Sequence, residues 1–205
     1  LLLNAFDYER FNVNLKKIIE FKSKKILFSN TDKLKIIKFK DDFIILLNDF
    51  ISKYPDIEID FWGDEFDGLD SIKKVNKKGF LENYSYKKEI YENNYLFAII
   101  PLGGEEDKET YDFNKCKSHI KFIDYSSLCI PGVYSNNPVY SDIIENNKTG
   151  IIVNNEYNEW FAAMEKLYLD EEFREKIKKN AFEFSLNNFG LKRKATTLMN
   201  IIYKL

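Results

Sequence analysis

A polar stretch near the middle of the chain carries residue types that could bind a phosphorylated ligand. Residues 114–125 read NKCKSHIKFIDY, so three lysines and a serine precede an aspartate. If a helix begins near Cys116 or Lys117, its first turn presents unpaired backbone N–H groups and the positive end of the helix dipole. Lys117 and Ser118 would add a cation and a hydroxyl there, and this combination favours phosphate binding.

The spacing of Lys117, Lys121 and Asp124 indicates a second use of the same stretch. Positions i, i+4 and i+7 lie on one face of a helix, so the three side chains would line up. A cation one turn before a carboxylate could serve phosphate and sugar hydroxyls in turn. On spacing alone, a surface ladder of lysine and aspartate remains the simpler interpretation.

The usual catalytic signatures are absent from the sequence. There is no G-x-G-x-x-G after the first predicted strand, no P-loop and no G-x-S-x-G elbow. The chain has one histidine, His119, which excludes a metal site built from several histidines. Its place within a predicted helix favours a structural or surface role over that of a base.

Short apolar runs alternate with amphipathic segments along the chain, and this order predicts the fold. The predicted strands are residues 25–29, 57–62, a short run around Val75, 95–101, 132–135 and 150–153. The predicted helices are residues 42–54, 86–91, 117–128, 139–146, 160–167, 171–188 and 192–203. About six alternations with short connections indicate an α/β fold: a Rossmann-like, doubly wound, mostly parallel sheet with a C-terminal helical extension.

Such a topology predicts where a ligand binds. In open α/β sheets the ligand lies outside the carboxyl ends of the parallel strands. The loops to consider are therefore residues 29–32, 63–67, 102–117 and 135–139.

Length, charge and composition exclude several classes of protein. The chain has 205 residues, with 31 Lys+Arg against 33 Asp+Glu, so it lacks the basic excess of a general nucleic-acid binder. Two cysteines, Cys116 and Cys129, are too few for a disulfide framework, which favours a reducing, cytoplasmic location. The longest apolar run, residues 95–102, is far shorter than the roughly 20 residues of a membrane helix. Because the chain begins with Leu1 and not with Met, we expect a fragment of a longer protein.

Several segments resemble the donor-binding part of retaining, group 1 glycosyltransferases of the GT-B fold. A subset of that family carries F-N-x-x-K-S-x-I-K-F-x-E-Y, and residues 113–125 here read FNKCKSHIKFIDY. Residues 129–135 (CIPGVYS) and 143–153 (IIENNKTGIIV) are similar to the family's G-x-P-V-x-x-S and G-x-x-G-x-L-V segments. With the first strand and the tail from Trp160 to Ala181, the likeness covers most of residues 25–181.

The resemblance implies roles for the polar stretch. Asp124 falls at the acidic residue that holds the donor ribose hydroxyls, while Lys117, Ser118 and Lys121 would neutralise the diphosphate. The lysines and the helix terminus would then do what a metal cation does, so neither a metal nor a resident cofactor is expected.

The end of the first strand would complete the binding site. The resemblance implies that Ser29, Asn30 and Thr31 face the cleft from there. The chain departs from the family pattern at Cys116, where many members carry a glutamate tied to the donor sugar, and at Asp124, which replaces glutamate.

The resemblance also implies a domain organisation. Residues 1–24 would be an interdomain lead-in, residues 25–190 a Rossmann-like nucleotide-sugar-binding domain and residues 191–205 a C-terminal helix. The chain would be the donor-binding half of a cytoplasmic glycosyltransferase of polysaccharide or glycoconjugate synthesis. Its partners would be the nucleotide-sugar and the missing N-terminal domain, which would hold the acceptor site. The fragment alone would be inactive, and the full-length enzyme would associate peripherally with a membrane.

Two alternatives remain open. The first is a flavodoxin-like or receiver-like binding module, although a receiver needs an acidic cluster where residues 30–32 supply only Asp32. The second is a degenerate glycosyltransferase domain kept for assembly, which the departures at Cys116 and Asp124 permit.

Overall fold

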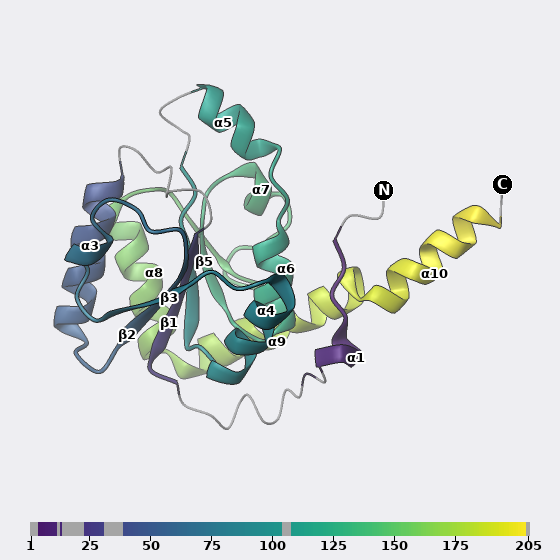
Figure 1. The fold of residues 1–205 in the computed structure, drawn as a ribbon, viewed down its shortest axis with the longest axis horizontal. Coiled ribbons are helices and arrows are strands. Elements are labelled where there is room, and N and C mark those ends of the chain that lie inside the picture. The colour runs from purple at the N-terminus through teal and green to yellow at the C-terminus, as the bar shows by residue number, and fades with distance from the viewer. Residues whose placement is uncertain (1–3, 12, 14–22, 31–38, 104–107, 204–205) are drawn as a thin grey trace.

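A six-stranded parallel sheet organises the molecule. The computed structural model describes residues 4–11, 13, 23–30, 39–103 and 108–203. Its strands follow the order β3-β2-β1-β4-β5-β6, and every neighbouring pair is parallel (Figure 1). The strands are β1 (Lys25–Asn30), β2 (Glu58–Gly63), β3 (Val75–Gly79), β4 (Phe97–Ile100), β5 (Gly132–Ser135) and β6 (Ile151–Val153). The predicted Rossmann-like α/β fold is confirmed.

Helices cover both faces of this sheet. On one face lie α3 (Lys40–Lys53) and α8 (Tyr157–Leu169), and on the other lie α4 (Asn83–Asn93) and α6 (Ile120–Ser127) (Figure 1). The long helix α9 (Glu171–Phe189) packs against both α6 and α8. The remaining helices are α1 (Tyr8–Phe11), the 3-10 turn η1 (Leu69–Ser71), α5 (Lys108–Lys115), α7 (Pro138–Ser141) and α10 (Leu191–Ile202).

Alternating side chains of β1 divide the interior into two cores. Ile26 and Phe28 pack in the core under α3 and α8, whereas Leu27 points into the core under α4 and α6. All three are fully buried, as expected for a parallel strand covered on both faces. Each core contains one of the two tryptophans, Trp160 in the first and Trp62 in the second.

The amphipathic pattern of residues 42–54 is realised in α3. Five of its apolar residues, at the spacing of one helical face, are buried against the sheet: Phe43, Leu46, Leu47, Phe50 and Ile51. The helix ends one residue before Tyr54, because Pro55 has no N–H to continue the ladder.

Two predicted helix boundaries are wrong. The helix predicted over residues 117–128 begins only at Ile120, and an unpredicted helix, α5, precedes it. Tight turns end α5, because the N–H groups of Cys116 and Lys117 donate to the carbonyls of Phe113 and Asn114.

The helix predicted over residues 139–146 is likewise too long. In the structure α7 ends at Ser141, and a closed turn follows it. In that turn Thr149 binds back to Glu145 through its N–H and its hydroxyl, and Asn147 is left-handed with φ 59°.

The described N-terminal segment is bound to the end of α9. Phe6 is only 1% exposed and forms a parallel bridge with Gly190. Its N–H donates to Phe189 O at 2.9 Å, and its carbonyl accepts from Leu191 N at 3.0 Å. Beyond this bridge α10 extends away from the body and has no buried residue (Figure 1). No helix in the described ranges combines the length and apolar character needed to cross a bilayer.

Candidate functional site

A cavity of about 240 Å³ lies at the carboxyl edge of the sheet. It is bounded by the ends of β1, β2 and β3, the start of α4 and one face of α6. Its apolar lining comes from Trp62, Phe80, Leu81 and Ile120. The strand order reverses beside β1, where doubly wound folds bind their ligands. A second cavity lies beside Lys24, at the amino edge of β1, and so at the opposite edge of the sheet.

Three of the predicted site residues meet at this cavity. Ser29 reaches it from the end of β1, and Lys121 and Asp124 reach it from one face of α6. Asn30 follows Ser29, and its buried amide nitrogen has no hydrogen-bond partner among the described residues. Thr31 lies outside the described residues.

Lys117 and Ser118 occupy a different position from the one predicted. They lie in the connection between α5 and α6, so Lys117 is not on a helical face with Lys121 and Asp124. The first turn of α6 instead begins at Ile120, with His119 as its N-cap residue. The charge of Lys117 still reaches the site, because it helps to lower the pKa of Lys121.

Lys121 places a poorly solvated cation at the end of β1. Its Nζ donates to Ser29 O at 2.6 Å. Burial, and secondly the charge of Lys117, lower the pKa of Lys121 to about 8. An anion in the cavity would restore part of the stabilisation that this amine loses on leaving water.

Asp124 places a carboxylate on the same helical face. The residue is 6% exposed, and its Oδ1 lies 2.8 Å from Nζ of Lys87 on α4. Burial raises the pKa of Asp124 to about 6, and the neighbouring Lys87 partly opposes this rise. An ionised carboxylate here can accept hydrogen bonds from two adjacent hydroxyls.

A chain of hydroxyl groups fixes the wall between these two charges. Tyr125 OH bonds to Ser29 Oγ and lies 2.9 Å from Tyr86 OH. Burial raises the pKa of Tyr86 to about 12 and that of Tyr125 well above its usual range, so both phenols stay neutral. The hydroxyl of Ser29 is thereby oriented by protein and not by solvent.

Several cavity residues were missed from the sequence. Phe80 is 73% exposed at the cavity mouth, in the connection after β3, which was not among the loops considered. Trp62 is 5% exposed, yet it also borders the cavity. In the sequence, Phe80 could have been found as an aromatic residue shortly after the strand predicted around Val75, at the end of the sheet where ligands bind.

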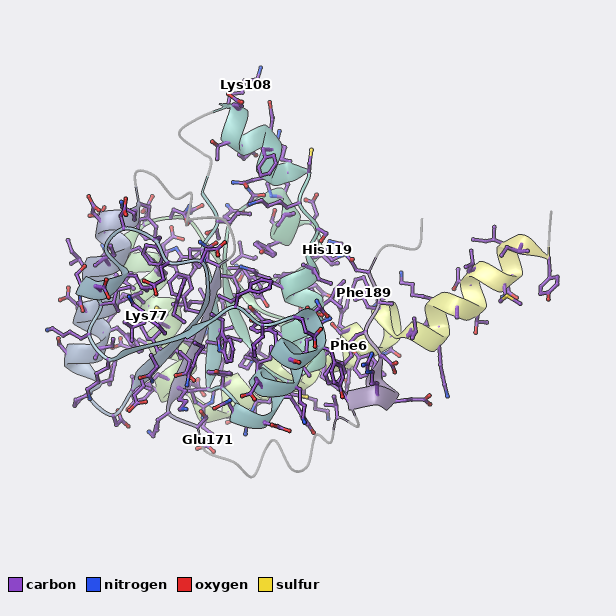
Figure 2. The ribbon with its side chains drawn as sticks, viewed as in Figure 1. Phe6, Lys77, Lys108, His119, Glu171 and Phe189 are labelled. Atoms are coloured by element: carbon purple, nitrogen blue, oxygen red, sulfur yellow. The ribbon has the colours of Figure 1, made fainter. Side chains whose placement is uncertain are left out.

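The described residues do not bring three or more His, Cys, Asp or Glu side chains together as a metal site would require. The absence of a metal and of a cofactor remains a prediction. Figure 2 shows that His119, the one histidine, lies near Phe189, and the centroids of their rings are 5.5 Å apart.

Solved structures share this fold. No protein-family model and no curated protein matches it. HepE from Anabaena, solved with UDP and glucose, matches 98% of this chain with a TM-score of 0.67 and 13% identity. TarM from S. aureus matches 88% of it with a TM-score of 0.62 and 15% identity. The chain spans 56% of the length of HepE and 35% of that of TarM.

A third solved structure consists of a single domain that this chain matches over its whole length. The C-terminal domain of LpcC from Francisella tularensis, a glycosyl transferase group 1 family protein, is covered over 100% of its length. It matches 91% of this chain with a TM-score of 0.63 and 14% identity. The fold of this chain is therefore that of the C-terminal domain of a GT-B glycosyltransferase.

Proposed function

We propose that this chain is the donor-binding half of a glycosyltransferase that moves a sugar from a nucleotide-sugar to an acceptor hydroxyl. The observation that carries the proposal is the cavity at the carboxyl edge, where Lys121 and Asp124 lie beside an apolar lining. A diphosphate, a ribose and a base need these three environments. The likeness to HepE, a protein solved with UDP and glucose, supports the same interpretation.

The nucleotide would lie along α6. Its base would pack against Phe80 and Trp62, because aromatic faces stack on planar rings. The ribose hydroxyls would donate to Asp124, and the diphosphate would extend toward Lys121 and Lys117. The buried amide nitrogen of Asn30 is a further donor at the same end of β1.

In the proposed reaction the bond between the sugar C1 and the diphosphate oxygen breaks, and its electron pair stays on that oxygen. The acceptor hydroxyl forms the new bond to C1 and loses its proton. Lys121 would stabilise the negative charge that develops on the departing diphosphate. A preorganised cation in a poorly solvated position does this without reorganising at the moment of reaction. No step of this scheme requires a metal ion.

The acceptor site and the group that takes the acceptor proton would belong to a second domain. We expect the chain alone to bind nucleotide weakly and to transfer no sugar. We place the whole enzyme at the cytoplasmic side of polysaccharide or glycoconjugate synthesis, with peripheral association to the membrane where its acceptors lie.

A degenerate glycosyltransferase domain is the second candidate. Cys116, which stands where the family carries a glutamate near the donor sugar, favours it. A degenerate domain of this kind, or a flavodoxin-like module, would not need to bind a uridine or guanosine diphosphate.

Calorimetric titration with uridine diphosphate and guanosine diphosphate tests the proposal. We expect saturable binding of one of them, at least about tenfold weaker in Lys121→Ala, since a charge-assisted hydrogen bond contributes roughly 1.5–3 kcal/mol. Lys115→Ala is the matched control, because this exposed lysine pairs with Asp112 on α5. We expect the affinity to be the same with magnesium and with a chelator. No binding of either nucleotide would contradict the proposal.

A further inference from the structure

Lys87 is a buried amine directly behind the cavity. It lies in the middle of α4 and is 8% exposed. A lysine is rarely buried to this degree unless its charge is paired. Lys87 does not line the cavity, whereas Asp124 does. Since Nζ of Lys87 lies 2.8 Å from Oδ1 of Asp124, the amine approaches that carboxylate from behind.

Three elements meet at this amine and restrict its position. Lys87 comes from α4 and Asp124 from α6. The N-terminal segment supplies Phe6, whose ring centroid lies 5.5 Å from Nζ of Lys87. The Phe6 ring is itself 1% exposed and bound through its backbone to the end of α9. The amine therefore has a carboxylate and an aromatic face as fixed neighbours.

The phenol groups around Asp124 are neutral near pH 7. Besides burial, the charge of Asp124 contributes to the raised pKa values of Tyr8 of α1, Tyr86 of α4 and Tyr125 of α6, so these three phenols face the carboxylate. Burial raises the pKa of each of these phenols, so none carries charge there. Lys121, one turn earlier on α6, has its amine on Ser29 O. Lys87 is the charged group that the described residues place against Asp124.

We propose that Lys87 is a positioning residue that keeps the Asp124 carboxylate ionised and oriented toward the ribose hydroxyls of the donor. This inference rests on the proposed function, because it assigns the carboxylate to a ribose. Removing one partner of a buried ion pair leaves the other charge uncompensated, so a carboxylate without Lys87 would take up a proton. A protonated acid accepts fewer hydrogen bonds than two adjacent hydroxyls can donate.

The pKa of Asp124 determines how binding of the ribose should change with pH. In the protein the pKa of Asp124 is about 6, and Lys87 lowers it against the effect of burial. Ribose binding should therefore be complete well above pH 6 and lost as pH falls through that value. Without Lys87 the same loss should begin at a higher pH.

Comparing two ligands isolates the ribose contribution. The affinities of uridine diphosphate and its 2′-deoxy analogue are measured by calorimetry from about pH 5 to about pH 8.5. Because both ligands carry the same phosphates, the ratio of their affinities reports the ribose contact alone. We expect this ratio to be high at pH 7.5 in the unchanged protein and to approach one near pH 5.

Three variants separate a positioning role from a structural one. In Lys87→Met the ratio should drop at least about fivefold at pH 7.5 and recover toward pH 8.5, and Lys87→Arg should restore it. Asp124→Asn should give a low ratio at every pH. Lys88→Met is the matched control, because Lys88 is an exposed lysine on the same helix, 3.9 Å from Glu92. An unchanged ratio and pH midpoint in Lys87→Met would overturn the proposal.

A ligand-free measurement keeps this inference distinct from the proposed function. Carbon-13 NMR of the Asp124 carboxyl group follows its titration in the unchanged protein and in the two Lys87 variants. We expect a higher midpoint in Lys87→Met and a nearly unchanged one in Lys87→Arg. If the unchanged protein binds no nucleotide, the proposed function fails, and a shifted midpoint still supports the ion-pair role of Lys87. Equal midpoints in all three proteins refute that role whatever the nucleotide does.

Discussion

At the scale of single residues, a second buried carboxylate, that of Asp60, is linked through Tyr95 to the cavity residue Trp62. Asp60 has no exposed surface, and it accepts hydrogen bonds from Tyr95 OH at 2.9 Å and from Nδ2 of Asn76 at 2.9 Å. Tyr95 OH in turn accepts from Nε1 of Trp62 at 3.0 Å. The indole N–H of Trp62 is thus hydrogen-bonded within the protein.

We predict that Asp60→Ala lowers the free energy of unfolding by about 1–3 kcal/mol, the cost of leaving the buried hydroxyl of Tyr95 and the half-buried amide of Asn76 without their acceptor. Besides Tyr95 and Asn76, it would leave the amine of Lys25, 3.5 Å away, without its carboxylate. Urea denaturation measures the change. Asp70→Ala is the control: this side chain is 85% exposed beside Lys77, so its loss should cost less than about 1 kcal/mol. Equal losses in the two variants would contradict the prediction.

We predict that Lys121 makes nucleotide affinity depend on pH in the direction opposite to Asp124. Its pKa of about 8 means that the amine loses its charge as pH rises through that value. Binding of uridine diphosphate should therefore weaken above pH 8. Lys121→Arg should remove this decline, since a guanidinium stays protonated there. Calorimetry at increasing pH distinguishes the two proteins, and parallel declines would exclude Lys121 as the cause.

At the scale of elements, the ends of β1 and β2 are held together by a glycine. Gly63 has φ 118°, and a Cβ there would lie 1.9 Å from Asn30 O. The next residue, Asp64, donates its N–H to the same oxygen at 2.9 Å. No larger residue fits without separating the two strand ends that border the cavity.

Gly63→Ala should therefore destabilise the fold by several kcal/mol, as overpacking and left-handed strain combine at one position. Gly79 provides the comparison within the same sheet. It also has a positive φ, 70°, but an added Cβ would meet nothing within 4 Å. Gly79→Ala should cost about 1 kcal/mol, from backbone strain alone. Thermal unfolding of both variants tests this, and comparable losses would refute the steric argument.

The order of strands and helices could be predicted because the apolar patterns are strong. The buried stripe of α3 and the fully apolar β4 leave little choice of element. The boundary between α5 and α6 could not be predicted in this way. The sequence of α5 is mostly polar, and its one buried residue, Asn114, is held by a bond from its amide to Gly103 O. Tertiary contact, not local pattern, sets that boundary.

The candidate site was predicted in part for a related reason. Ser29, Lys121 and Asp124 belong to motifs that a resemblance can match position by position. Phe80 comes from the connection after β3 and Lys87 comes from α4, and the positions of both relative to α6 are set only by packing. No spacing within the chain relates residue 87 to residue 124.

At the scale of the whole molecule, α10 contributes little to the body. Leu198, Met199 and Ile202 are exposed on it, and none of its residues is buried.

Truncation after Leu191 tests the independence of the body. This end point keeps the hydrogen bond from Leu191 N to Phe6 O. We predict that the truncated chain keeps its nucleotide affinity and a melting temperature within a few degrees of the full chain. It should also self-associate less, because exposed apolar surface is removed. Scanning calorimetry and light scattering measure the two effects, and a large drop in melting temperature would show that α10 stabilises the body.

The division of the interior into two cores also gives the protein two separate fluorescent reporters. Trp160 lies in the core under α3 and α8, and Trp62 lies in the other core, at the edge of the cavity. Replacing Trp160 with phenylalanine would leave a single indole whose emission reports on the cavity. Replacing Trp62 would leave one that reports on the opposite face of the sheet. Ligand binding and global unfolding can thus be followed by different signals in the same chain.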